Sequence, residues 1–270
     1  MGMAVQFRLK RILHKEKSKY FDIIVADTEP IGRVLIFREG DNYTIQSAQL
    51  FDVYDEMLAH VPMAAHPSPK KILIIGGGDG IVLREVLRYQ MVEHVVLVEI
   101  DPKVVDVSRK YLRLDDGALE DRRLEIVYED AARYIKKLGE KFDVILGDYS
   151  DPYQNLPASS LISEEFYRNA YNILDDDGIL AVQAGSPIFQ GDILRRIYNN
   201  ARKVFPIVRV YWAPVIYYPG AIWTFLAATK GLDPTIPRRE IQGTIYYNRE
   251  IHKSAFILPE FIKRLLEGSL

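Results

Sequence analysis

The sequence predicts an α/β protein with a doubly wound, mainly parallel sheet and a small antiparallel β domain at the N-terminus. Strand and helix patterns alternate after Pro69, a glycine-rich turn follows the first of these strands, and only short strands separated by turn residues precede His66. The length of 270 residues suits one large domain with a smaller one. We therefore predict an N-terminal β-hairpin domain over 1–66 and a catalytic domain over 67–270.

The predicted N-terminal domain contains three short runs of apolar and β-branched residues, at 21–26, 32–37 and 43–49. Glu29-Pro30 and Glu39-Gly40-Asp41 separate these runs, which predicts tight turns in an antiparallel sheet. The segment 53–61 has apolar residues at helical spacing, so we expect a short helix leading into the domain boundary.

The rest of the chain alternates between strand and helix patterns. The expected strands are 71–75, 94–100, 124–128, 142–146, 178–183, 208–213 and 222–228. The expected helices are 81–89, 102–111, one from Ala131, 164–174, 192–204 and one after Pro259. Such alternation implies βαβ crossovers and a parallel sheet with helices on both faces. Because ligands bind these sheets beyond the carboxyl ends of the strands, the residues that follow each strand are the candidates for a site.

Charge and composition argue against several classes of protein. Lys and Arg total 35 against 37 Asp and Glu, for a net charge of −2, so no nucleic-acid partner is expected. The five histidines lie far apart and the chain has no cysteine, which predicts neither a metal site nor a disulfide. Basic residues interrupt the apolar residues of 1–17, so we expect no signal peptide, no membrane segment and a cytoplasmic protein.

A glycine run follows the first strand of the large domain, with the sequence Gly76-Gly77-Gly78-Asp79-Gly80. Glycines allow a sharp turn and a close approach of the backbone to a ligand, and the following helix adds its N–H groups. The dinucleotide fingerprint would need a third glycine or alanine at Ile81. The pattern G-x-G-x-G instead indicates a Rossmann-like, class I methyltransferase-like domain that binds a sulfonium nucleoside, and a plain tight turn is the alternative.

Acidic residues follow the next two strands. Glu99 lies about 20 residues past the glycine run, where a carboxylate can accept both hydrogen bonds from a ribose diol. Asp101 precedes a proline and is better suited to be the N-cap of the next helix. Asp130 fits two roles equally, another N-cap or an acceptor for an adenine amino group.

The fourth strand ends in Asp148, and Asp151 follows three residues later on a loop that faces the glycine run. Two acids in this position predict a cation site. Asp79 adds a third acid, which would repel the carboxylate of an ordinary methyl donor and attract an amine. The three aspartates at 175–177 instead predict a solvated turn at the opposite edge.

Longer motifs resemble the polyamine aminopropyltransferases, the family of spermidine synthase. The resemblance covers nearly the whole chain, and its specific parts are His66–Gly80, Leu83-Arg-Glu-Val86, Val98-Glu-Ile-Asp101, Asp148-x-Ser-Asp-Pro152, Tyr246–His252 and Ala255–Phe261. It implies transfer of a 3-aminopropyl group from decarboxylated S-adenosylmethionine to a polyamine, with release of methylthioadenosine. It further implies no permanently bound cofactor, no metal and a homo-oligomer.

The resemblance also implies roles for single residues. In the donor site, Glu99 would hold the ribose, Asp130 the adenine and Asp79 the terminal amine. Asp148 would accept the proton of the attacking amine, which requires a pKa raised by desolvation and a neighbouring charge such as Asp151. The acceptor would be placed by Asp151, Tyr54, Tyr218 and, unless it only bonds backbone, Gln183.

Departures from the family pattern concern the acceptor. Phe21 and Asp55 stand where the pattern has glutamines, and Tyr149 replaces a small residue. Gly147-Asp148 and Gln183-Ala-Gly185 are similar to the thermospermine synthase branch. We therefore assign Asp55 to the acceptor site and leave the acceptor open among putrescine, agmatine and spermidine.

Three other functions remain open from the sequence. The first is an S-adenosylmethionine-dependent class I methyltransferase with the same nucleotide-binding half. The second is a binding subunit without turnover, which the two acids Asp148 and Asp151 disfavour. The third is an NAD oxidoreductase, which Glu99 would suit but the missing third glycine does not.

Overall fold

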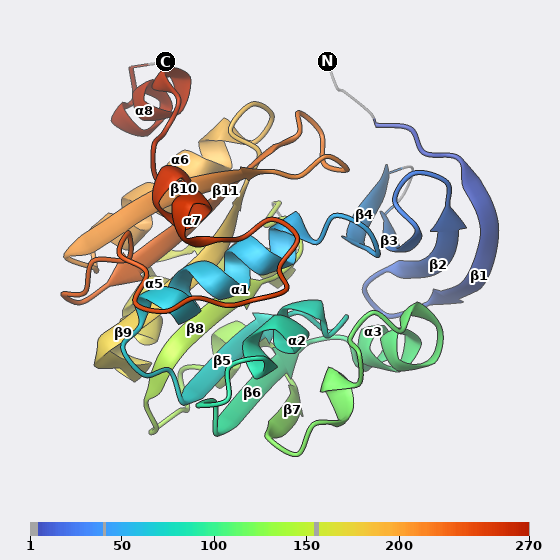
Figure 1. The fold of residues 1–270 in the computed structure, drawn as a ribbon, viewed down its shortest axis with the longest axis horizontal. Coiled ribbons are helices and arrows are strands. Elements are labelled where there is room, and N and C mark those ends of the chain that lie inside the picture. The colour runs from blue at the N-terminus through green and yellow to red at the C-terminus, as the bar shows by residue number, and fades with distance from the viewer. Residues whose placement is uncertain (1–4, 40–41, 154–156, 270) are drawn as a thin grey trace.

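Two β-sheets carry the fold of the computed structural model, which describes residues 5–39, 42–153 and 157–269 (Figure 1). The N-terminal sheet is antiparallel, in the order β1 (Leu9–Lys17), β2 (Asp22–Thr28), β3 (Arg33–Glu39) and β4 (Asn42–Ala48). The sequence analysis missed β1, because this edge strand is largely exposed and its charged residues hide the alternation of a half-buried strand. Residues 40–41 of the predicted turn lie outside the described residues.

The large sheet has seven strands in the order β10-β11-β9-β8-β5-β6-β7. Their bounds are β5 (Lys71–Gly76), β6 (His94–Glu99), β7 (Leu124–Tyr128), β8 (Phe142–Asp148), β9 (Leu174–Gly185), β10 (Ile207–Pro214) and β11 (Ile222–Thr229). Strand β11 runs antiparallel to both of its neighbours, β10 and β9. The pairs β9–β8, β8–β5, β5–β6 and β6–β7 are parallel, which confirms the predicted fold class. The chain moves outward from β5 to β7 and then returns to β8, so the topology switches between β5 and β8.

Helices cover both faces of the large sheet. They are α1 (Val53–Ala65), α2 (Ile81–Leu87), α3 (Pro102–Val107), α4 (Ala131–Tyr134), α5 (Glu164–Ile173), α6 (Gly191–Arg202), α7 (Arg249–Ser254) and α8 (Glu260–Glu267). Alternate residues of β5 serve the two faces: Ile72 and Ile74 pack in the core that contains α1 and α2, and Leu73 and Ile75 in the core that contains α5 and α6. The short helix α7 was not predicted.

The aspartates at 175–177 form the start of β9, not the predicted turn. They are nevertheless largely exposed, and the Asp176 side chain is fully so. The solvated surroundings were therefore predicted correctly and the backbone conformation was not.

Helix α1 is buried along its whole length, from Val53 to Ala65. It is longer than predicted, because the helix continues through Pro62 to Ala65. Its core also contains Ile24 and Val34 of the N-terminal sheet, so apolar packing joins the two sheets through this helix. The division after residue 66 remains a prediction.

Candidate active site

The glycine run turns the chain sharply between β5 and α2. Gly76, Gly77 and Gly80 have φ values of 81°, 70° and 82°, in the left-handed region that favours glycine. The Gly77 N–H donates to the Asp148 carbonyl at 2.9 Å. The turn is thereby fixed against the end of β8, at the switch point of the sheet.

A Gly76→Ala variant is expected to lose about 3 kcal/mol or more of folding stability, from left-handed strain together with overpacking. A Cβ atom at Gly76 would lie 2.1 Å from the Asp148 carbonyl oxygen, which is backbone and cannot move aside. Denaturant unfolding measures the loss. Gly139→Ala is the matched control, since a Cβ there meets no atom within 4 Å. Equal stability of the two variants would contradict the expected close approach.

Glu99 ends β6 with its carboxyl turned back to the glycine run. It accepts hydrogen bonds from the Gly78 N–H at 3.2 Å and the Asp101 N–H at 2.9 Å. The side chain is only 7% exposed, and burial raises its pKa to about 7. At Gly78 a Cβ would lie 2.8 Å from a Glu99 carboxyl oxygen, so a glycine there leaves room for the acid.

Asp79 is buried beside the first turn of α2. One carboxyl oxygen accepts from the Ile81 N–H at 3.0 Å, and the other accepts from the Ser47 hydroxyl of β4. Burial raises the pKa of Asp79, although the Ser47 bond acts in the opposite direction. A residue of the N-terminal sheet therefore orients an acid of the large domain.

Asp148 and Tyr54 form the centre of the site. The Tyr54 hydroxyl donates to the Asp148 carboxyl at 2.9 Å. Burial, followed by the charge of Asp79, raises the pKa of Asp148 to about 8, and the Tyr54 bond opposes this rise. The sequence predicted a raised pKa with Asp151 as the neighbouring charge, but Asp79 is the acid that contributes most.

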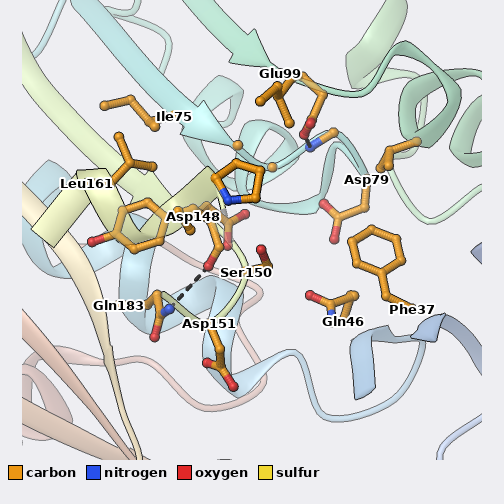
Figure 2. Close-up of a pocket in the computed structure, with 18 of the residues that line it drawn as sticks. Phe37, Gln46, Ile75, Asp79, Glu99, Asp148, Ser150, Asp151, Leu161 and Gln183 are labelled. Atoms are coloured by element: carbon orange, nitrogen blue, oxygen red, sulfur yellow. Dashed lines mark hydrogen bonds between the residues drawn. The ribbon is translucent and has the colours of Figure 1, made fainter. Parts of the chain in front are cut away.

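Most of the predicted site residues line one cavity, which Figure 2 shows between the strand ends and β4. Those lining it are Tyr54, Gly76, Gly78, Asp79, Glu99, Asp130, Asp148, Asp151, Gln183 and Tyr218. Gly80 and Asp55 are not among the lining residues. Asp55 is 3% exposed, and burial followed by the charge of Asp79 raises its pKa well above the ordinary value. Burial and the nearby acids thus favour the neutral form of Asp55, and its role at the acceptor stays a prediction.

Several predicted side chains also have structural partners. Asp101 caps α3 by accepting from the Lys103 N–H at 3.1 Å. This is the N-cap role that the sequence favoured for it. Asp130 caps α4 through the Arg133 N–H at 3.3 Å while it lines the cavity. Gln183 hydrogen-bonds to backbone, donating to the Tyr149 carbonyl at 3.1 Å and accepting from the Gly185 N–H at 3.0 Å. In the free protein Gln183 therefore acts as a polar residue at a strand end that bonds backbone, and its contact with the acceptor stays a prediction.

Comparison with known proteins identifies the chain. The spermine/spermidine synthase domain matches residues 51–239. The chain belongs to this family. The polyamine aminopropyltransferase of Moorella thermoacetica is 41% identical over 98% of this chain and 93% of that protein. That of Thermoanaerobacter sp. (strain X514) is 40% identical over 98% of this chain and 95% of that protein.

Solved structures of spermidine synthases share the fold. One, in complex with the transition state analogue AdoDATO, has a TM-score of 0.91 and 36% identity, covering 97% of this chain and 90% of that one. The spermidine synthase from Thermotoga maritima has a TM-score of 0.87 and 36% identity, covering 98% and 90%. The resemblance to the spermidine synthase family is thereby confirmed.

Sequence reasoning about this spermine/spermidine synthase family member missed the contribution of β4. Gln46 lines the cavity on the side of Asp79 (Figure 2). Its carbonyl accepts from the Tyr218 hydroxyl at 3.3 Å. Ser47 bonds Asp79. Polar residues at consecutive positions near the end of a predicted strand were the available signal. This signal is weak, because the rule that places ligands at strand ends applies to the parallel sheet and not to the antiparallel one.

Two features of the described residues bear on other classes of site. Within 5–39, 42–153 and 157–269, no group of three or more His, Asp or Glu side chains is placed to hold a metal ion. Over the same residues, no helix has the length and apolar character required to span a bilayer.

Proposed function

We propose that this protein is a polyamine aminopropyltransferase, which moves a 3-aminopropyl group from decarboxylated S-adenosylmethionine to an amine of a polyamine and releases methylthioadenosine. The observation that carries the proposal is the pair of acids, the buried Asp79 and the half-buried Asp148, in one cavity beside the glycine run. Both co-substrates present an ammonium group. Two separated acids in one cavity can hold one ammonium each.

The donor fits the side of the cavity formed by β5, β6 and β4. Glu99 would accept hydrogen bonds from the ribose hydroxyls, in the position where acidic residues of Rossmann-like folds bind ribose. Asp130 would accept from the adenine amino group with the carboxylate lone pairs that its cap leaves over. Asp79 would pair with the ammonium at the end of the aminopropyl group.

The reaction joins the acceptor nitrogen to the carbon bound to sulfur. As the N–C bond forms, the C–S bond breaks and its electron pair stays on sulfur, so the sulfonium becomes the neutral thioether of methylthioadenosine. The proton lost from nitrogen passes to Asp148. An alkylammonium with a pKa near 10.4 needs about 4.6 kcal/mol to be deprotonated at pH 7, so a base with a raised pKa lowers this cost.

The acceptor fits the side formed by Tyr54, Asp151 and Tyr218. The aromatic rings of Tyr54 and Tyr218 lie 5.9 Å apart and edge to face, which leaves apolar surface for a methylene chain. Asp151 lines the cavity on the loop after β8, where it can pair with a second ammonium. Putrescine, agmatine or spermidine would satisfy this arrangement, and Asp55 would add a further acid for a longer or differently ended amine.

Product analysis tests the proposed function. The protein is incubated with decarboxylated S-adenosylmethionine and equal concentrations of putrescine, agmatine and spermidine, and the nucleoside product is identified by mass spectrometry. Methylthioadenosine with one elongated amine is the expected result, and the amine identifies the acceptor. Formation of adenosylhomocysteine from S-adenosylmethionine, without methylthioadenosine, would support the methyltransferase instead.

The kcat/KM for the acceptor is expected to decrease as the pH falls below about 8, because the pKa of Asp148 in the free enzyme is about 8 and only the carboxylate can accept a proton. The acid limb of kcat should lie at lower pH, since a bound ammonium favours the charged carboxylate. Initial rates measured from about pH 5 to about pH 10 give the profiles of both kcat/KM and kcat. A kcat/KM that stays constant from about pH 8 down to about pH 5 would place the acid limb towards the ordinary aspartate pKa of about 3.9 and contradict the role of burial.

We expect a homo-oligomer, at least a dimer, with the N-terminal sheet as the contact. The strand order leaves β1 and β4 at the edges of that sheet, and edge strands tend to pair. Light scattering that gave the mass of one 31.0 kDa chain would refute this prediction. A cytoplasmic location and the absence of a metal likewise remain predictions.

A further inference from the structure

The segment 244–252 contains the C-terminal motif of the sequence but contributes no residue to the lining of the cavity. It instead bonds α1. The backbone N–H groups of Ile245, Tyr246 and Tyr247 donate to the Glu56 carboxylate at 2.6, 2.8 and 2.7 Å. Glu56 is 2% exposed. Figure 1 shows the chain ahead of α7 running along α1.

The segment is held in one conformation by a buried chain of hydrogen bonds. The Tyr247 hydroxyl donates to His252 Nδ1 at 2.8 Å, and His252 Nε2 donates to the Pro234 carbonyl at 2.9 Å. Burial lowers the pKa of His252 to about 4, so the ring is neutral and a proton on Nε2 satisfies both bonds. The Thr244 hydroxyl closes the turn on the Tyr247 carbonyl at 2.5 Å.

The same segment contacts α1 at a second point, one turn after Glu56. The Tyr247 ring lies 5.1 Å from the ring of His60. His60 in turn contacts Glu85 at 3.0 Å through Nε2. Because residues four apart lie on the same face of a helix, both contacts hold that one face of α1 against the segment 244–252.

The rotation of α1 determines where Tyr54 points, because Tyr54 lies two residues before Glu56 on the same helix. Its hydroxyl must reach the Asp148 carboxyl, to which it donates at 2.9 Å. Helix α1 is buried throughout, so a change in the position or orientation of the helix moves Tyr54 with it.

We propose that Glu56 is a positioning residue, which fixes α1 to the segment 244–252 and thereby keeps the Tyr54 hydroxyl on Asp148 during aminopropyl transfer. This inference rests on the proposed function. It assigns to the C-terminal motif a role in the reaction, although the motif lies outside the cavity lining.

The hydrogen bond from Tyr54 to Asp148 also affects the pH dependence of the reaction. The charged and titratable groups that act on Asp148 are Asp79, Glu99 and Tyr54. Tyr54 itself is acted on by Tyr218 and Asp55 as well as by Asp148. Of these groups, only Tyr54 lowers the pKa of Asp148. Losing its hydrogen bond should therefore move the acid limb of the reaction to higher pH.

The test compares Glu56→Gln with the full-length wild-type enzyme. The amide keeps the size of the side chain but offers one carbonyl oxygen to three N–H donors. We expect the acid limb of kcat/KM for the acceptor to rise by about 0.5 to 1 pH unit, which lowers the rate at pH 7 by roughly 3-fold to 10-fold. The KM for the donor should change by less than about 2-fold, because Asp79 and Glu99 are held by other elements. Glu250→Gln, an exposed position on α7, is the matched control.

A double variant distinguishes positioning from a general loss of stability. If Glu56 acts through Tyr54, Glu56→Gln should add nothing to the shifted acid limb of Tyr54→Phe. Independent, additive shifts, or a Glu56→Gln profile identical to that of the wild type, would overturn the inference. If Glu56→Gln does not fold, Thr244→Val loosens the same segment and should shift the limb in the same direction. A wild-type enzyme without aminopropyl transfer would instead refute the proposed function.

Discussion

Asp148→Asn is expected to lower kcat by about 10²-fold to 10⁴-fold, the usual contribution of a general base. The amide has nearly the shape of the carboxyl. Its carbonyl oxygen can still accept the hydrogen bond that the Tyr54 hydroxyl donates to Asp148 at 2.9 Å in the wild-type protein. It cannot take a proton from the attacking amine. The loss should therefore appear in turnover, while methylthioadenosine still binds.

Two measurements separate this loss from misfolding. Calorimetric affinity for methylthioadenosine should stay within about 3-fold of the wild-type value, a difference below about 1 kcal/mol. Asp176→Asn makes the same chemical change at a fully exposed aspartate of β9 and should leave turnover unchanged. Wild-type turnover by Asp148→Asn would assign the proton to another group, and the cavity offers Asp151 as the candidate.

The part of the site that could be predicted from the sequence lies at the carboxyl ends of parallel strands. Glu99, Asp148 and the glycine run follow β6, β8 and β5 directly, and the strand order brings these three ends together. The rule for doubly wound sheets needs only the order of the elements. For this reason the predicted acids and glycines were found at one cavity.

The contribution of the N-terminal sheet could not be predicted in this way. Ser47 reaches Asp79 across 32 positions of sequence, and Phe37 stacks on Phe21 with ring centroids 4.4 Å apart beside the same cavity. These contacts depend on how two sheets pack through α1, which no local periodicity encodes. The placement of Asp55 away from the lining has the same origin, because α1 turns Tyr54 and not Asp55 into the cavity.

The C-terminal motif illustrates a related limit. Its residues were noticed because they form a specific pattern, but the pattern does not reveal that three of its N–H groups bond Glu56. Backbone donors carry no sequence signal, since every residue except proline has one. A role that acts through the backbone therefore becomes visible only in the structure.

Asp79→Asn is expected to weaken binding of decarboxylated S-adenosylmethionine by about 30-fold or more, because breaking a buried, hydrogen-bonded charge pair costs about 2 to 5 kcal/mol. The same change should weaken selection between donors. Intact S-adenosylmethionine carries a carboxylate near this acid, and a neutral amide no longer repels it. The affinity ratio of the two donors should thus fall, even where both bind more weakly.

Ser47→Ala provides the comparison that isolates the charge of Asp79. It removes the hydroxyl that donates to Asp79 but leaves the carboxyl and its bond from the Ile81 N–H at 3.0 Å. Loss of one hydrogen bond to a charged group costs about 1.5 to 3 kcal/mol at most, so donor affinity should fall less than in Asp79→Asn. The donor ratio should also stay high in Ser47→Ala, because the negative charge remains. Calorimetric titration of both variants with both donors measures these quantities. An unchanged ratio in Asp79→Asn would mean that selection against the carboxylate comes from the shape of the cavity and not from the acid.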